Sequence, residues 1–185
     1  MHRDLVERAA KGDQEAYAAL ASLSADRLFA VAHRILRDWH LAEDALQRTL
    51  VTIWNELPRL RDPDRFEAWT YRLIARESVS AARREVRGGP LVRLLPDDAD
   101  ALVAPDQYRA VADRDQLERG FRRLRPEQRA VLVLHYYVGL PLAEIADVLG
   151  TPVGTAGSRL HYAVRALRAA LEADERSTAA KEHLA

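Results

Sequence analysis

Five arginines recur along one stretch of the sequence at a spacing that suits the binding of a phosphate backbone. They are Arg65, Arg72, Arg76, Arg83 and Arg87. At the helical angle of about 100° per residue, they all fall within a sector of roughly 60°. Arginine makes charge-assisted contacts with phosphate oxygens, so this stripe is a candidate nucleic-acid contact. The alternative is a solvated face whose arginines pair with Glu67, Glu77 and Glu85.

A second group of hydrogen-bonding side chains lies towards the C-terminus. Gly150, Thr151 and Pro152 separate two apolar stretches, which is the layout of a helix-turn-helix. No acidic residue occurs between Leu149 and Leu171. The second helix would present to DNA the side chains of Thr155, Ser158, Arg159, His161, Tyr162 and Arg165. The alternative is a helical hairpin with no role in nucleic-acid binding.

A third polar face belongs to the helix that we expect over residues 41–57. Asp44, Gln47, Arg48 and Val51 recur at helical spacings of three and four residues. A face of mixed charge is usually solvated, and the alternative is contact with a partner helix.

The sequence offers little to an enzyme. The histidines form no local metal motif, and we find neither a glycine-rich phosphate loop nor a nucleophile elbow. Glu43 and Asp44 would point to different faces of their helix, which makes them a poor acid–base pair. Cysteine is absent, which excludes disulfides, thiol catalysis and cysteine-ligated metals. We therefore expect no catalytic residue, no metal and no cofactor.

All three faces must lie on helices, and the first half of the sequence contains signals for where its helices begin and end. One apolar stripe predicts a helix over 41–57, with Leu46, Leu50, Ile53, Trp54 and Leu57 buried. Asp62 and Pro63 are a start signal for a second helix, which we expect to end near Arg87. Upstream, Asp13 is placed to cap a helix carrying Tyr17, Leu20 and Leu23 that continues over Leu28–Leu36.

The second half has similar signals. Pro126 opens a helix that we expect to end at Gly139, and a short helix over Leu142–Leu149 should end at Gly150. Thr151 is then expected to cap the last helix, with Pro152 in its first position and an end near Ala173.

Charge divides the chain in the same way. Its 185 residues have a formal net charge of 0, but residues 88–116 carry 3 basic and 6 acidic side chains. This acidic stretch also contains Gly88, Gly89, Pro90, Pro96 and Pro105, which interrupt helices. We expect an all-α protein of two small helical domains joined by a flexible acidic linker. The boundaries are 1–87 and 113–173 for the domains, 88–112 for the linker and 174–185 for a polar tail.

Two stretches resemble one family of proteins. LRPEQRAVLVLHYYVGLPLAEIADVLGTPVGTAGSRLHYAVRALRAAL, residues 124–171, resembles region 4 of the sigma-70 family in its extracytoplasmic-function (ECF) group. AEDALQRTLVTIW (42–54) and FEAWTYRLIARESVSAARRE (66–85) resemble region 2 of the same group. The resemblance implies an alternative sigma factor, which joins core RNA polymerase, recognises a promoter and helps to melt its −10 element.

The resemblance also assigns partners to the three faces. Contact with the β′ clamp helices of the polymerase is implied for Asp44, Gln47, Arg48, Thr49 and Val51. Contact with the −10 element is implied for Arg59, Arg61, Arg65, Arg72, Arg76, Ser80, Arg83 and Arg84. The helix over 153–171 would bind the −35 element in the major groove, with the outer surface of its domain on the β flap.

The sequence also leads to expectations about regulation, localisation and oligomeric state. By the same resemblance, the acidic linker threads the RNA channel of the polymerase and an anti-sigma factor holds the protein inactive. The N-terminal stretch has no apolar segment of the kind a secretion signal needs, and no run of about 18 apolar residues occurs. We expect a cytoplasmic protein without membrane insertion that is a monomer when free.

Five positions depart from the family pattern. Arg48 replaces a usual Glu, Glu77 a usual Asn, Ala81 a usual Asp, Gly157 a usual Lys or Arg, and Tyr162 another basic residue. An anionic Glu77 beside a DNA strand would repel phosphate. Gly157 should weaken the last helix by about 1 kcal/mol relative to Ala. These departures predict an altered promoter preference or a weaker affinity for DNA.

Two other functions compete with a working sigma factor. One is a degenerate sigma-like protein that binds polymerase or an anti-sigma factor without melting promoters. The other is a dimeric helix-turn-helix repressor, against which the lack of an evident dimerisation helix argues.

Overall fold

The computed structural model describes residues 3–87 and 108–182, and every regular element in these ranges is helical. The N-terminal domain contains α1 (Arg3–Ala10), α2 (Gln14–Leu36), α3 (Trp39–Glu56) and α4 (Phe66–Arg87). Short 3₁₀ turns, η1 (Leu57–Arg59) and η2 (Pro63–Arg65), connect α3 to α4. The C-terminal domain contains α5 (Tyr108–Arg123), α6 (Pro126–Leu132), the π-helical turn η4 (Val133–Tyr137), α7 (Leu142–Leu149) and α8 (Val153–Glu182).

Side-chain caps fix the starts of the helices in the N-terminal domain. The Asp13 carboxylate accepts a hydrogen bond from the Ala16 N–H at 3.0 Å, as its position predicts. Asp38 caps α3 through the Leu41 N–H at 2.8 Å. Arg37, between the two helices, adopts a left-handed conformation with φ 59°, which lets the chain reverse tightly.

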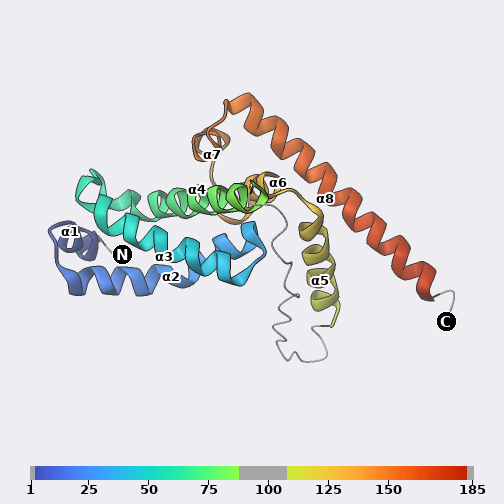
Figure 1. The fold of residues 1–185 in the computed structure, drawn as a ribbon, viewed down its shortest axis with the longest axis horizontal. Helices are drawn as coiled ribbons and strands as arrows, with labels where there is room; N and C mark the ends of the chain where they lie inside the picture. Colours follow the sequence, from blue (N-terminus) through green and yellow to red (C-terminus); the bar gives the residue numbers. More distant parts are fainter. Residues whose placement is uncertain (1–2, 88–107, 183–185) are drawn as a thin grey trace.

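The helices α2, α3 and α4 lie side by side and form the core of the N-terminal domain (Figure 1). Leu28, Ile53 and Ile74, one from each helix, are fully buried there. The predicted apolar stripe is confirmed at Leu46 and Ile53 of α3 and at Leu57 of η1, which are buried, and at Leu50, which packs against the core. Trp54, which was expected to be buried with them, is half-buried, with its ring edge against Tyr17.

The C-terminal domain is organised around α8, which contacts α5, α6 and α7. Small residues on α8, Ala156 and Ala163, are fully buried and allow the helices to approach closely. The predicted turn at Gly150 is confirmed, because this residue ends α7 with φ 64°. Residues 142–173 therefore have the predicted helix-turn-helix layout.

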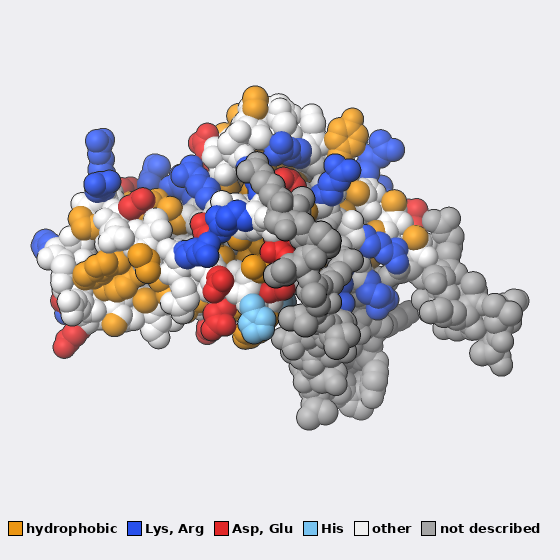
Figure 2. Space-filling view, in the orientation of Figure 1, with side chains coloured by type: hydrophobic (Ala, Val, Ile, Leu, Met, Phe, Trp, Pro, Cys, Tyr) orange, Lys and Arg blue, Asp and Glu red, His pale blue; other side chains and the backbone are white. Residues whose placement is uncertain are grey.

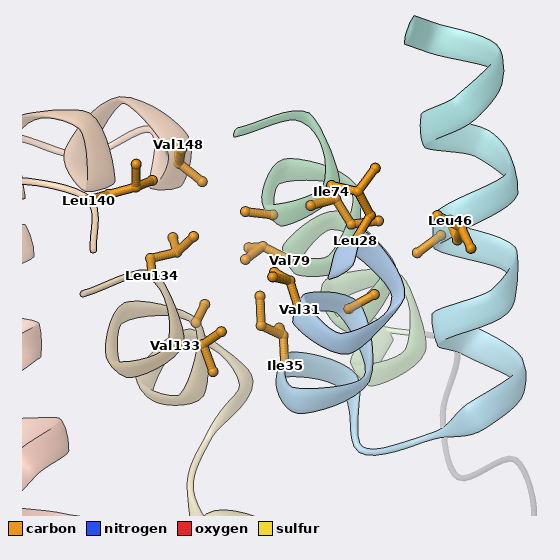
Figure 3. Close-up of a cluster of buried hydrophobic side chains, with 14 of the residues drawn as sticks. Leu28, Val31, Ile35, Leu46, Ile74, Val79, Val133, Leu134, Leu140 and Val148 are labelled. Carbon is orange, nitrogen blue, oxygen red and sulfur yellow. The ribbon is translucent and has the colours of Figure 1, made fainter. Parts of the chain in front are cut away.

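The two domains share buried apolar surface. Figure 3 shows Val133, Leu134, Leu140 and Val148 of the C-terminal domain facing α2 and α4 of the N-terminal domain. Ile35 and Val79 lie on the opposite side of this contact, and both are buried. Across the boundary, α2 meets α6 and η4, and α4 meets α6 and α7.

Several predicted boundaries differ from the structure. The helix expected from 62 begins with the 3₁₀ turn η2, and the regular helix starts at Phe66. The α5 helix begins at Tyr108, inside the predicted linker, because its sequence lacks Gly and Pro until Gly120. The α8 helix continues to Glu182, beyond the predicted end and through most of the predicted tail. Residues 88–107 of the predicted linker lie outside the described residues.

Thr151 does not cap α8, contrary to the sequence-based expectation. The Pro152 carbonyl accepts the first backbone hydrogen bonds of α8, from Thr155 and Ala156 at 2.9 and 3.0 Å. Thr151 instead closes α7, because its N–H donates to the Ala146 carbonyl at 3.0 Å. Its hydroxyl is buried without a hydrogen-bond partner among the described residues.

Two further features were not predicted. No helix was predicted over α1, although Val6 and Ala9 are buried against the rest of the N-terminal domain. Leu23, expected on the apolar face of α2, is 49% exposed.

Candidate nucleic-acid interface

Three arginines of α4 form the arginine face, which we define as Arg72, Arg76 and Arg83. Spacings of four and seven residues place them on one side of the helix, as predicted. The Arg72 side chain is 28% exposed and that of Arg83 is 43% exposed. Arg65 lies before α4, in η2, where it pairs with Asp62 at 3.4 Å and is 74% exposed. The side chain of Arg87 lies outside the described residues.

The groups opposite the arginine face come from the C-terminal domain. Arg72 pairs with Glu144 of α7 at 3.5 Å, and Arg83 pairs with Glu127 of α6 at 3.4 Å. The Arg76 guanidinium donates to the Asp147 carbonyl at 3.5 Å. The carboxylates that neutralise this face therefore lie across the domain boundary. The expected partners on α4 itself, Glu67 and Glu77, pair with Arg27 and with Arg48 and Arg84 instead.

On the side of the molecule shown in Figure 2, basic and acidic side chains alternate across the middle of the molecule.

Arg129 of α6 is a buried part of the domain contact and is 8% exposed. Its Nε donates to the Ile35 carbonyl at 2.6 Å, and one terminal nitrogen donates to the Leu36 carbonyl at 3.5 Å. The other terminal nitrogen donates to Leu124 within its own domain at 3.2 Å. The α2 carbonyls are at the negative end of that helix, where a cation is favourable. Burial, together with the nearby charge of Arg37, lowers the pKa of Arg129 to about 10.

Two more contacts join the domains. Arg37, 11% exposed, forms an ion pair with Glu118 of α5. The Arg34 guanidinium carbon lies 4.1 Å from the centre of the Tyr137 ring, at cation–π distance. The domain contact therefore combines a buried apolar centre with a rim of charged pairs.

The predicted polymerase-binding face of α3 is open. Asp44, Gln47 and Arg48 are exposed, and Val51 is 62% exposed although it is apolar. Thr49 does not share this face, because it is turned into the core and is only 1% exposed. The exposed residues recur at three and four positions, whereas Thr49 lies about 140° around the helix from Asp44 at 100° per residue.

Glu77 does not stand free beside the arginine face. Its carboxylate lies 3.3 Å from Arg48 of α3 and 2.8 Å from Arg84 of α4. Arg84 also donates to the Ser80 hydroxyl at 3.0 Å. The phosphate repulsion expected from Glu77 is thus reduced, because two cations neutralise the carboxylate.

These residues line a groove between α3 and α4. Its volume is about 180 Å³, and its lining includes Asp44, Arg48, Glu77, Ala81 and Arg84. Ala81 is itself buried, at 8% exposure. Two of the residues expected to contact the −10 element, Ser80 and Arg84, therefore belong to a network that reaches the α3 face. Arg59 and Arg61 are exposed near the start of α4, apart from this network.

The predicted −35 residues share the N-terminal half of α8. Ser158, His161, Tyr162 and Arg165 are exposed, and Thr155 and Arg159 are half-buried. The Ser158 hydroxyl donates back to the Gly154 carbonyl at 2.9 Å. One terminal nitrogen of Arg159 is buried without a hydrogen-bond partner in the described part of the chain. The exposed side chains occupy successive turns of a helix whose first turn lacks acidic residues.

Arg129 is a buried, hydrogen-bonded residue of the domain contact that was not predicted. It directly precedes an apolar stretch, AVLVL (130–134), whose five residues are all buried. An arginine among buried positions of a helix indicates a specific set of acceptors, because an unpaired buried charge is costly. The sequence carries that signal but does not say that the acceptors are carbonyls of another domain.

Within the described ranges, no group of His, Asp and Glu side chains could hold a metal ion. The same part of the chain has no helix that is both long enough and apolar enough to cross a membrane.

Comparisons with known proteins match both domains. The model of sigma-70 region 2 matches residues 20–88, and that of sigma-70, region 4 matches residues 114–167. The ECF RNA polymerase sigma factor SigL of Mycobacterium tuberculosis is 36% identical over 169 residues, which cover 90% of this chain and 95% of SigL. SigW of Bacillus subtilis is 26% identical over 178 residues, 91% of this chain and 95% of SigW.

Solved structures have a similar fold. CnrH, solved in complex with the cytosolic domain of CnrY, has a TM-score of 0.59 and 27% identity, covering 93% of this chain and 97% of CnrH. The sigma factor RpoE of Bartonella quintana, solved with the anti-sigma factor NepR, has a TM-score of 0.61 and 23% identity. That match covers 85% of this chain and 98% of RpoE.

Proposed function

Because the chain belongs to the ECF group of the sigma-70 family and is a promoter-directing sigma factor, we propose that it acts by binding core RNA polymerase and promoter DNA. The observation that carries the proposal is the presence of both family domains in order, each with an exposed helix face of suitable chemistry. In this proposal the protein catalyses no covalent reaction. Its contribution is binding and the separation of two DNA strands.

The polymerase would bind the exposed face of α3. Asp44, Gln47, Arg48 and Val51 present polar groups around one exposed apolar side chain, a composition that suits docking of a helical partner. Thr49 would act indirectly, by packing α3 against its own domain.

The arginine face would hold the single strand of the melted −10 element. Arg72, Arg76 and Arg83 offer guanidinium groups along one side of α4, a spacing that follows a phosphate backbone. Arg59, Arg61 and Arg65 would contact DNA near the start of α4. Ser80 and Arg84 would contact DNA beside the groove between α3 and α4.

The C-terminal domain would bind the −35 element. The start of α8 would enter the major groove, where Arg165 could read a guanine edge and Ser158, His161 and Tyr162 could contact bases or phosphates. Thr155 and Arg159 lie on the adjoining, half-buried side of the helix.

We also propose a protein partner that controls activity, an anti-sigma factor. CnrH, a structure of similar fold, was solved with a second protein, the cytosolic domain of CnrY. Because the polymerase-binding face of α3 is exposed, the protein would compete for core polymerase at all times unless an inhibitor bound it reversibly.

One observation favours the alternative of a degenerate sigma-like protein. Gly157 offers no side chain on the helix expected to bind the −35 element. The second departure that motivated this alternative, Glu77, is neutralised by two arginines and supports it less.

Run-off transcription tests the proposal. Purified core polymerase, the full chain and a library of randomised promoters are combined at two salt concentrations, since phosphate contacts weaken with salt. We expect transcripts that share −35 and −10 elements. Core binding without transcripts would favour the degenerate alternative, and no core binding at micromolar concentration would overturn both.

A matched pair of variants tests the α3 face within the same experiment. Val51→Asp should weaken core binding by about tenfold, because it places a charge at the centre of an apolar contact. Leu23→Asp puts the same charge on another exposed apolar residue, outside the proposed face, and should leave core binding within twofold. Equal losses in both variants would contradict the assignment of the face.

A further inference from the structure

We propose that α1 is a positioning element for promoter melting, which holds the connection between α3 and α4 in the conformation that meets the −10 element. We define this connection, residues 57–65, as the connector. The inference rests on the proposed function, because the connector carries three of the arginines proposed to contact DNA. Arg3 of α1 is the positioning residue, and it acts through Asp64 of the connector.

The connector has little regular structure of its own. It consists of the two 3₁₀ turns η1 and η2, separated by extended backbone at Leu60 and Asp62. In η1 the Leu60 N–H donates to the Leu57 carbonyl at 3.0 Å. In η2 the Arg65 N–H donates to the Asp62 carbonyl at 3.1 Å. Both bonds lie within single turns of poor hydrogen-bond geometry, so the orientation of the connector depends on its contacts with neighbouring elements.

The arginines of the connector face solvent. Arg59 and Arg61 are exposed, and the side chain of Arg65 is 74% exposed. Short turns that present binding groups in a fixed arrangement need support from a rigid element behind them. The question is therefore which element supports the connector on the side away from its arginines.

The helix α1 packs against the connector. Figure 1 shows α1 at the end of the domain where α3 leads into α4, and α1 meets both η1 and η2. Val6 and Ala9 of α1 are each 2% exposed, and Leu57 of η1 is fully buried. All three belong to one apolar core, against which Leu60 also packs. Movement of the connector away from α1 would expose these side chains to water, which is unfavourable.

An ion pair adds a directed contact between the first turn of α1 and η2. One terminal nitrogen of Arg3 donates to the Asp64 carboxylate at 2.8 Å. The Nε of the same guanidinium donates to Glu7, one turn further along α1, also at 2.8 Å. Because Glu7 holds the guanidinium from the helix side, the remaining donors are aimed at the connector.

The same ion pair changes the charge that the connector presents to DNA. Asp64 directly precedes Arg65, and its side chain is 65% exposed. A free carboxylate at this place would repel an approaching phosphate. Arg3 neutralises the carboxylate and holds it towards α1, which leaves the arginines of the connector as its charged groups for DNA.

The other end of α1 is anchored to α2. Gly12 has φ 93°, and the Asp13 N–H donates to the Arg8 carbonyl at 3.2 Å, which closes a tight turn between the two helices. The Arg8 guanidinium also pairs with the Asp13 carboxylate at 2.7 Å. The two arginines of α1 therefore serve opposite ends of the helix, since Arg8 holds the turn into α2 and Arg3 holds the connector.

Hydrogen exchange in the free chain tests the positioning without DNA or polymerase. The Leu60 and Arg65 amides donate within the connector, so their exchange reports its opening. Arg3→Ala should speed exchange at both amides by about threefold, a modest change because the ion pair is exposed to solvent. Arg8→Ala is the matched control, because it removes the same side chain from the same helix. It should leave exchange at these amides within about 1.5-fold.

Base-pair opening by the polymerase complex is the functional readout. Core polymerase and the full chain are mixed with a promoter duplex from the library that carries 2-aminopurine in its −10 element, whose fluorescence rises as the strands separate. Arg3→Ala should reduce melting by about threefold, because the connector is correctly held in a smaller fraction of molecules. Binding to core and to a −35 duplex should stay within about 1.5-fold, which a general loss of stability would not allow. Arg8→Ala should leave all three measurements unchanged.

A double-mutant cycle separates positioning from direct contact with DNA. In an Asp64→Ala background, Arg3→Ala should have no further effect on melting, because its partner is already gone. The charge exchange Arg3→Asp with Asp64→Arg should recover the melting that Arg3→Asp alone loses.

Two results would overturn the inference. An equal loss of melting from Arg3→Ala in both backgrounds would mean that Arg3 binds DNA itself. Unchanged exchange at the Leu60 and Arg65 amides in Arg3→Ala would mean that α1 does not hold the connector through this residue. Failure of the proposed function is distinct, because the unaltered chain would then fail to bind core or to open the duplex, whatever the exchange rates.

Discussion

The charged residues that depart from the family pattern in the N-terminal domain are paired with each other, and the departing residues of the C-terminal domain are open to solvent. In the N-terminal domain, Arg48 and Glu77 replace residues of other charge, and each is the partner of the other at 3.3 Å. In the C-terminal domain, Gly157 leaves open space, since a Cβ added there would meet only Leu142 Cδ1 at 3.9 Å. Tyr162 lies against the ring of His161 and remains 62% exposed.

Whether a departing residue is paired or exposed decides what it can affect. Arg48 and Glu77 form an ion pair with each other, so changing either residue first affects the stability and position of the helices that the pair connects, α3 and α4. A substituted residue that faces solvent acts on whatever ligand comes to that face. We therefore expect changes at 48 and 77 to be coupled, and changes on α8 to act independently and mainly on DNA.

The largest expected effect lies on the open side of this comparison. Arg165→Ala should weaken binding to a duplex carrying the −35 element recovered from the promoter library, because one base or phosphate contact is lost. A bidentate contact is worth about 1–3 kcal/mol, or roughly 5- to 150-fold in affinity. Fluorescence anisotropy with the full chain measures the loss.

The matched control for this prediction is Arg168→Ala. Arg168 has the same side chain and is also exposed, but it lies one turn further along α8 and outside the proposed site. Its loss should cost less than threefold. Equal losses at 165 and 168 would mean that α8 contributes only general charge.

The next effect concerns the empty space at Gly157. Gly157→Ala should stabilise the protein by about 1 kcal/mol, because alanine is the better helix former and the added methyl meets no close contact. Urea unfolding followed by circular dichroism measures the gain. The gain should come without a change in core binding.

Gly120 on α5 provides the matched comparison. A Cβ there would lie 3.0 Å from Leu167 Cδ1 and 3.1 Å from Leu171 Cδ2, so the gain in helix propensity should be offset by crowding. A larger gain at 120 than at 157 would contradict our description of the open face.

The sequence predicted most of the elements for a physical reason. Caps and turn residues act locally, so Asp13, Gly150 and the apolar stripe on α3 marked their helices correctly. The position of a helix start was predicted wrongly where two adjacent residues could each begin the same helix. Thr151 and Pro152 both suit a helix start, and the choice between them depended on how α7 ends.

The site was less predictable than the fold. Spacing alone put Arg72, Arg76 and Arg83 on one face, but could not supply the partners of that face, because these lie more than forty residues away in sequence. Thr49 was grouped with the exposed residues of α3 by resemblance, although its angle around the helix turns it into the core. Contacts between domains are tertiary information, which periodicity does not contain.

The smallest expected effect tests the paired side of the comparison. Arg48→Ala and Glu77→Ala should each lower the free energy of unfolding, and the double variant should lose less than the sum of the two. The coupling should be about 0.2–1 kcal/mol, since Arg48 is 57% exposed and solvent weakens the pair. Glu77→Ala should cost more than Arg48→Ala, because it also removes the pair with Arg84.

Restoring the usual residues of the family sharpens this test. Arg48→Glu alone would place a second carboxylate beside Glu77 and should be the least stable variant of the series, because like charges in contact repel. Adding Glu77→Asn should recover most of that loss, since the repelling carboxylate is gone. If Arg48→Glu were tolerated without the second change, the two positions would be independent, and the N-terminal departures would have to act on the polymerase or DNA directly, as those on α8 do.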